Sequence, residues 1–127
     1  MTKTHLLVVV VDDDRSIRLA LERLVRCHGM HVETYASGEK FLKAVETHQF
    51  DCVMLDLHMP YMNGHEVLSR LSRLPTRIPA IVITGHDTPE ARERVLAAGA
   101  AAYLLKPVDE HALLNAISTA TLVQQSA

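Results

Sequence analysis

Three consecutive aspartates follow an apolar run near the start of the chain. Residues 6–11 read LLVVVV, and Asp12, Asp13 and Asp14 come directly after them. Adjacent carboxylates raise one another's pKa, and burial raises it further, so such a cluster is costly unless a positive charge joins it. The end of this apolar segment must therefore lie where solvent or a ligand can reach it, which limits the folds open to the chain.

Five short segments are typical of β-strands. Four of them are apolar at almost every position, which predicts strands of a parallel sheet that is covered on both faces. The other segment, residues 31–36, alternates apolar and polar side chains, so we expect it at an edge of the sheet. The four apolar segments are residues 6–11, 52–55, 80–83 and 100–105.

Helix signals occupy the stretches between the strands and after the last one. In the first stretch, apolar residues recur at helical spacing from Ile17 to Val25. The third helix is predicted to end near residue 74, the fourth at Gly99 and the fifth near residue 123. The residues expected to cap or begin the helices are Asp14, Ser37, Gly64, Thr88 and Asp109.

Five successive β–α units predict one three-layer α/β domain over residues 1–127, with right-handed crossovers. Hydrophobic residues make up 48% of the chain and charged residues 22%, as in an ordinary globular domain. The net charge is −2 and the apolar runs are shorter than a bilayer span, so we expect a cytoplasmic protein that binds neither nucleic acid nor membranes. Residues 121–127 are predicted to be a C-terminal tail or the start of a linker.

Polar side chains follow the four apolar strands. Asp12 and Asp13 come after the first strand, and Asp56, Thr84 and Lys106 come after the other three. In an open α/β sheet, ligands bind outside these carboxyl ends. Clustered carboxylates there suit Mg²⁺, which takes one or two carboxylates together with water and phosphate oxygens. With an ammonium and a hydroxyl beside it, this site is suited to phosphoryl transfer onto a carboxylate.

Four motifs in the chain resemble those of a known family. VVDDDRSIR, VMLDLHMPYMNG, AIVITGHD and AYLLKPVD are similar, in this order, to the motifs of response regulator receiver domains in two-component signalling. The resemblance covers about residues 6–120, and LPTRIPAIVITGHD and AGAAAYLLKPV are most similar to the FixJ type. It implies a flavodoxin-like (βα)5 sandwich whose parallel five-stranded sheet has the strand order 2-1-3-4-5.

Carried over position by position, the resemblance implies a role for each residue of the site. Asp56 would accept the phosphoryl group, and Lys106 would contact it. Asp13 would bind Mg²⁺ directly, and Asp12 would act mainly through ordered water. His58 would offer the metal its backbone carbonyl, so that its imidazole need not be a ligand.

The resemblance also implies residues that respond to phosphorylation. Thr84 would turn toward the phosphoryl oxygens, and Tyr103 would change its rotamer in response. The bond between Lys106 and Pro107 is expected to be cis, which an X-Pro bond tolerates at low cost.

Three further residues are expected to modulate the reaction. Gly85 would leave room for the phosphodonor. His58 and His86, each two residues after a residue of the site, would change the rate of dephosphorylation in a direction that the sequence does not give. The chain has eight histidines, and most of them lack the spacing of a zinc site and are interpreted as surface residues.

The predicted function is a phosphorylation-dependent signalling switch. A histidine kinase or a small phosphodonor would supply the phosphoryl group, and the domain would catalyse only its own phosphorylation and dephosphorylation. The face made by the fourth helix, fifth strand and fifth helix would relay the change to an effector domain or a partner protein. By the same resemblance, activation can produce a homodimer.

Other functions remain as alternatives. A receiver-like interaction domain that never carries phosphate would share the fold, although such domains usually lose a residue of the site. An aspartate-nucleophile phosphatase wants a second acid two residues after the nucleophile, where this chain has His58. A nucleotide or flavin binder is disfavoured because no glycine-rich loop follows the first strand.

Overall fold

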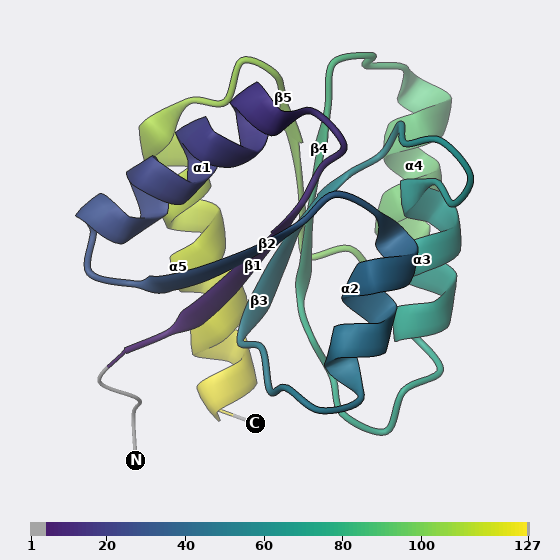
Figure 1. Cartoon of the computed structure of the whole chain (residues 1–127). Helices are drawn as coiled ribbons and strands as arrows, with labels where there is room; N and C mark the ends of the chain where they lie inside the picture. Colours follow the sequence, from purple (N-terminus) through teal and green to yellow (C-terminus); the bar gives the residue numbers. More distant parts are fainter. Residues whose placement is uncertain (1–4, 127) are drawn as a thin grey trace.

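Strands and helices alternate along the whole chain and form a parallel five-stranded sheet between two layers of helices (Figure 1). The computed structural model describes residues 5–126, with side chains through Leu122. The strand order β2-β1-β3-β4-β5 confirms the predicted topology and the flavodoxin-like class. The strands are β1 (Leu7–Val11), β2 (His31–Tyr35), β3 (Cys52–Asp56), β4 (Ala80–Thr84) and β5 (Ala102–Leu105), and the helices are α1 (Arg15–Cys27), α2 (Gly38–Val45), α3 (Gly64–Leu71), α4 (Pro89–Ala97) and α5 (Glu110–Ser126).

Alternating side chains of the strands divide the core into two apolar clusters. Val9 and Val11 of β1 belong to the cluster on the face covered by α2, α3 and α4, whereas Val8 and Val10 belong to the cluster under α1 and α5 (Figure 1). None of these four valines is more than 1% exposed. Since successive side chains of a strand point to opposite faces, one unbroken apolar run can supply both clusters.

Polar side chains cap the helices where the sequence predicts them. The Asp14 carboxylate accepts hydrogen bonds from the backbone N–H groups of Ser16 and Ile17, at 2.8 and 3.2 Å. Such bonds satisfy N–H groups that have no partner within the helix. The other capping residues are Ser37, Thr88 and Asp109, together with Asn63, which was not predicted.

Two helix ends differ from the prediction. α3 ends at Leu71 rather than near residue 74, because the N–H groups of Arg73 and Leu74 bond to carbonyls only three residues back, as in a tightened last turn. α5 continues through Ser126, three residues beyond the predicted end, and residue 127 lies outside the described part of the chain. A role of residues 121–127 as a tail or linker stays a prediction.

The two edges of the sheet are β2 and β5, as the predicted strand order 2-1-3-4-5 requires. Residues of β5 are half-buried or exposed, and Leu105 keeps 46% of its surface accessible. Tyr103 packs against one apolar cluster and Ala102 and Leu104 pack against the other, so both faces of β5 are covered, as predicted, although less completely than those of the interior strands. An apolar composition alone does not distinguish an interior strand from an edge strand with an apolar surface.

The loop between β3 and α3 contains a tight turn and a close backbone contact. Tyr61 has a positive φ of 68°, and the Met62 N–H donates to the Pro60 carbonyl at 2.8 Å, as in a γ-turn. The Tyr61 side chain is 97% exposed, so no burial offsets this unfavourable backbone geometry. At the end of the loop, Gly64 packs directly against the backbone of β3 and of Leu57.

Neither cysteine forms a disulfide: Cys52 is buried and Cys27 is exposed. Across residues 5–126, no helix combines the length and the apolar character needed to cross a membrane. The cytoplasmic location stays a prediction.

We expect Gly64→Ala to lower the free energy of unfolding by about 1–3 kcal/mol, the usual cost of overpacking. A Cβ at this position would lie 2.8 Å from the Asp56 carbonyl oxygen and 2.8 Å from Leu57 Cα, and these backbone atoms cannot move aside cheaply. Urea unfolding measures the change. Gly85→Ala is the matched control because a Cβ at Gly85 meets no atom within 4 Å. Equal stabilities of the two variants would contradict the packing argument.

Candidate functional site

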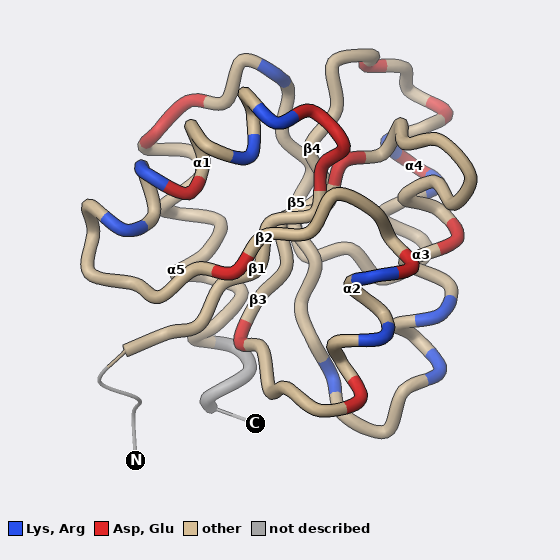
Figure 2. The backbone as a smooth tube through the Cα atoms, in the orientation of Figure 1, with Lys and Arg blue, Asp and Glu red and all other residues tan. Residues whose placement is uncertain are grey.

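The predicted site residues meet at one edge of the sheet. Asp56 and Thr84 are the last residues of β3 and β4, while Asp12 and Lys106 directly follow β1 and β5. Because these strands are parallel and paired in register, their carboxyl ends lie side by side. Figure 2 shows acidic positions gathered where β1 leads into α1.

Three carboxylates at this edge can share one metal ion. Asp12, Asp13 and Asp56 each offer an oxygen, and these oxygens all lie within 4.8 Å of one another. Asp12 and Asp56 are only 2% and 4% exposed, whereas Asp13 is exposed to solvent. Two ligands are thus fixed by packing and the third lies on the open side, an arrangement that leaves room for water or phosphate oxygens around a hard cation.

Lys106 supplies the positive charge of the site. Its Nζ lies 3.0 Å from Asp12 Oδ2 and 3.2 Å from Asp56 Oδ1. Burial lowers the pKa of Lys106, but the hydrogen bond with Asp12 and the charges of Asp56 and Asp12 outweigh it and raise the pKa above its usual value. The side chain is therefore a permanent cation near neutral pH. Its peptide bond to Pro107 is cis, as predicted.

The environment of Asp56 disfavours its charged form. Burial, and then the charge of Asp12, raise the pKa of Asp56 from 3.8 to about 6, although Lys106 and the His58 N–H act in the opposite direction. Without a further cation, this carboxylate is ionised only at some cost. A bound divalent ion would remove that cost. The protein side chains alone therefore supply too little positive charge to balance the carboxylates of the site.

Thr84 is fully buried, and its hydroxyl is bonded within its own loop. Thr84 Oγ1 accepts a hydrogen bond from the His86 N–H at 3.0 Å, and the same hydroxyl donates to the His86 carbonyl at 3.4 Å. Within the described residues, no hydrogen bond joins this hydroxyl to Asp56 or Lys106. The structure thus brings Thr84 to the predicted edge in a conformation turned toward its own backbone.

Tyr103 lies in β5, and its hydroxyl is buried. In the described part of the chain no partner meets hydrogen-bonding geometry at this oxygen, although burial, and then Asp87, raise the pKa of Tyr103. Arg92 of α4 lies over the ring, with Cζ 5.8 Å from its centroid. Packing and this cation–π contact hold the ring, while Asp87 lies close enough to the hydroxyl to affect its pKa.

His58 and His86, which belong to different loops, contact each other. Their ring centroids lie 5.2 Å apart in an edge-to-face arrangement, with an angle of 88° between the ring planes. Both residues are exposed, and the His58 N–H donates to Asp56 Oδ1 at 3.4 Å. The pair stands beside the carboxylates, on the loops that follow β3 and β4.

Arg18 of α1 is a contact that the sequence did not indicate. Its Nη1 donates to the backbone carbonyl of Asp12 at 2.8 Å. The Asp14 N–H also donates to Asp12 Oδ1, at 2.9 Å, so the β1–α1 loop is held from both directions. A bond to a backbone carbonyl leaves no pattern in side-chain types, so the sequence gives no signal for this contact.

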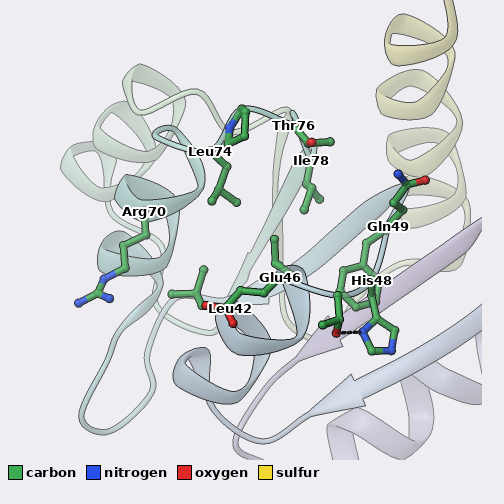
Figure 3. Close-up of a pocket in the computed structure, with 12 residues that line it drawn as sticks. Leu42, Glu46, His48, Gln49, Arg70, Leu74, Thr76 and Ile78 are labelled. Atoms are coloured by element: carbon green, nitrogen blue, oxygen red, sulfur yellow. Dashed lines mark hydrogen bonds between the residues drawn. The ribbon is translucent and has the colours of Figure 1, made fainter.

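A cavity of about 570 Å³ lies at the opposite end of the sheet, between α2 and α3 (Figure 3). Leu42, Leu74, Ile78 and Arg70 are among the residues that line it. None of the predicted site residues borders this cavity. The charged residues that can act together lie at the carboxyl ends of the strands.

We expect Asp56→Asn to stabilise the metal-free protein by about 1–3 kcal/mol at pH 7 and to have little effect at pH 4. The folded protein keeps a proton on Asp56 between roughly pH 4 and 6 that the unfolded chain has lost, so wild-type stability falls as pH rises through this window. Urea unfolding in EDTA at both pH values measures the difference between the proteins. Glu93→Gln, an exposed change on α4, is the control, and a difference independent of pH would contradict the argument.

Comparison with known proteins shows the family to which this chain belongs. Residues 8–118 match the family model described as "Response regulator receiver domain". The chain is 37% identical over 120 residues to the response regulator protein TmoT of Ectopseudomonas mendocina, covering 94% of this chain and 54% of the relative. It is 36% identical to the transcriptional regulatory protein FixJ of Rhizobium meliloti, covering 93% of this chain and 58% of the relative. The chain thus spans about half the length of the curated relatives it matches.

Solved structures agree with the sequence relatives. A CheY-like receiver domain protein from Methanospirillum hungatei superposes with a TM-score of 0.90 at 29% identity, covering 97% of this chain and 98% of that one. A receiver protein from Burkholderia phymatum has a TM-score of 0.81 at 42% identity, covering 91% of this chain and 94% of that one. The chain belongs to the response regulator receiver domain family.

Proposed function

We propose that this domain is a phosphorylation-dependent switch that accepts a phosphoryl group on Asp56 in the presence of Mg²⁺. The observation that carries the proposal is the shared Lys106 ammonium, which contacts Asp12 and Asp56 beside a third carboxylate. The donor is a histidine kinase or a small phosphodonor. An Asp56 oxygen attacks the phosphorus, the bond from phosphorus to the donor's leaving group breaks, and an acyl phosphate forms.

The three carboxylates fit Mg²⁺ in the proposed site. Asp13 and Asp56 would hold the ion directly, Asp12 would act mainly through water, and His58 would contribute its backbone carbonyl. When bound, Mg²⁺ supplies positive charge for the phosphoryl oxygens. Lys106 Nζ, already 3.2 Å from Asp56, would neutralise the phosphoryl group from the other side. The raised pKa of Asp56 supports the need for this second cation, since burial and Asp12 disfavour its free anion.

The switch in this proposal begins at Thr84. Phosphorylation adds about −1.5 to −2 charges and new acceptor oxygens. The Thr84 hydroxyl would exchange its bonds to the His86 backbone for a phosphoryl oxygen, and Tyr103 would change its rotamer. Leu96 of α4 and Leu105 of β5 are 44% and 46% exposed, and this α4–β5–α5 face would carry the readout. The differential contacts of Lys106 and Thr84 in the phosphorylated state shift a two-state equilibrium.

Gly85, His58 and His86 would modulate the reaction. A Cβ at Gly85 would meet no atom within 4 Å, so there is open space beside Thr84 for a donor to approach. His58 and His86 stand at the entrance and would change the rate of dephosphorylation. Equal acyl phosphate lifetimes in wild type, His58→Ala and His86→Ala would remove this part of the proposal.

The partners follow from the relatives' length and names. Because the chain spans about half of TmoT and FixJ, we propose that an effector domain or partner protein receives the signal. Dimerisation on activation is part of the same proposal. A non-phosphorylated interaction domain is the second candidate, and the phosphatase alternative is disfavoured by His58 at the position of the second acid.

Incubation with Mg²⁺ and acetyl phosphate should add the mass of one phosphoryl group, as measured by intact-protein mass spectrometry. Asp56→Asn should abolish the adduct because it removes the nucleophile. Asp14→Asn is the matched control: it neutralises the neighbouring acid of the triplet and keeps an equally good helix cap. No adduct with any donor would leave the interaction-domain reading, and rapid turnover of unrelated phosphate esters would favour the phosphatase.

Asp13→Asn should weaken Mg²⁺ binding by about tenfold or more, equivalent to at least about 1.4 kcal/mol. The residue is exposed, so its loss removes a ligand charge without disturbing the core. Isothermal titration calorimetry measures the affinity, with Asp14→Asn again as the control. The same affinity in both variants would show that the ion binds elsewhere.

A further inference from the structure

The contact between His58 and His86 joins two loops that are 28 positions apart in the sequence (86 − 58). Each loop is held by its backbone: the His58 N–H donates to Asp56 Oδ1 at 3.4 Å, and the His86 N–H donates to buried Thr84 Oγ1 at 3.0 Å. Among the described residues, neither ring takes part in a hydrogen bond. Two imidazoles are thus placed together by fixed loops, with their ring nitrogens free for a ligand.

The spacing of the two rings suits a transition-metal ion. Zn–N bonds are about 2.0–2.1 Å long, so two imidazoles on one tetrahedral ion have ring centroids about 5 Å apart. The observed separation is 5.2 Å. Imidazole nitrogens favour Zn²⁺, Cu²⁺ or Ni²⁺, whereas the carboxylate cluster favours Mg²⁺. The two groups of ligands therefore select different metals.

A third imidazole, that of His65, is affected electrostatically by His58. His65 is the second residue of α3, and its pKa is lowered by burial, then by Arg94 and by His58. Burial and both neighbouring positive charges disfavour protonation of His65. The positive charge of Arg94 disfavours a bound cation near His65.

A second histidine pair provides a comparison within the same chain. His5 and His31 also pack edge-to-face, with ring centroids 5.3 Å apart. Here, however, His5 Nδ1 forms a hydrogen bond with the Gly29 carbonyl at 3.4 Å. Ring contact alone is therefore insufficient to define a metal site, and the free nitrogens at His58 and His86 distinguish the pair beside Asp56.

We propose that His58 and His86 form a binding site for a transition-metal dication of the Zn²⁺ class. An ion bridging the two rings would join the β3–α3 and β4–α4 loops across the entrance to Asp56. Occupancy would then slow the approach of a phosphodonor. This last step rests on the proposed function, whereas metal binding itself does not.

Isothermal titration with Zn²⁺, in saturating Mg²⁺ so that the carboxylates are occupied, tests the site on the unphosphorylated protein. We expect one ion per chain, at least tenfold weaker binding in His58→Ala and in His86→Ala, and unchanged binding in His31→Ala and in Asp56→Asn. Thermal unfolding checks that each variant is folded. Unchanged affinity in His86→Ala would overturn the proposal, and so would a loss seen only in His31→Ala or only in Asp56→Asn.

Phosphorylation by acetyl phosphate, followed with and without Zn²⁺, tests the consequence. Zn²⁺ should slow the reaction of wild type several-fold and leave the rate of His86→Ala unchanged, each compared with its own metal-free rate. Equal slowing of both proteins would overturn the inhibitory role. If neither protein is phosphorylated without Zn²⁺, the proposed function fails, while the calorimetric result still decides the metal site.

Discussion

The ion pairs of Lys106 with Asp12 and Asp56 are the interactions on which the rest of the site depends. In the strand order β1-β3-β4-β5, the ammonium that follows β5 reaches past the end of β4 to Asp56 and on to the residue after β1. Without this cation, two nearly buried carboxylates would face each other in a medium that disfavours both anions. The lysine therefore connects the ends of three strands. Its positive charge also lowers the cost of holding the Asp56 carboxylate in a buried position.

A site of this kind conflicts with the stability of the fold around it. Asp56 is surrounded closely enough to raise its pKa to about 6, and Gly64 leaves no room for a side chain against the backbone of the same residue. Tyr61 adds an unfavourable positive φ in the same loop. Strained or poorly solvated groups cluster where a protein performs chemistry, and the rest of the structure must hold them there. Here the two apolar clusters on either side of the sheet supply that support.

Features that depend on local sequence could be predicted, and features that depend on distant contacts could not. The apolar runs and the polar residues that end them predict a parallel sheet with one functional edge, because a strand's direction decides where its last side chain lies. Asp14, Ser37 and Thr88 cap helices by bonds within four residues. The exposed surface of β5 depends on having no sixth strand beside it. The bond from Arg18 to a backbone carbonyl and the packing of His58 on His86 arise only when separate segments meet.

The sheet separates two apolar clusters that have no residue in common. Substitutions in the layer of α1 and α5 meet different neighbours from those in the layer of α2, α3 and α4, so their energetic effects should add rather than interact. Only the backbone of the strands between them must keep its register, and that register is what delivers the acidic and basic groups to their common edge.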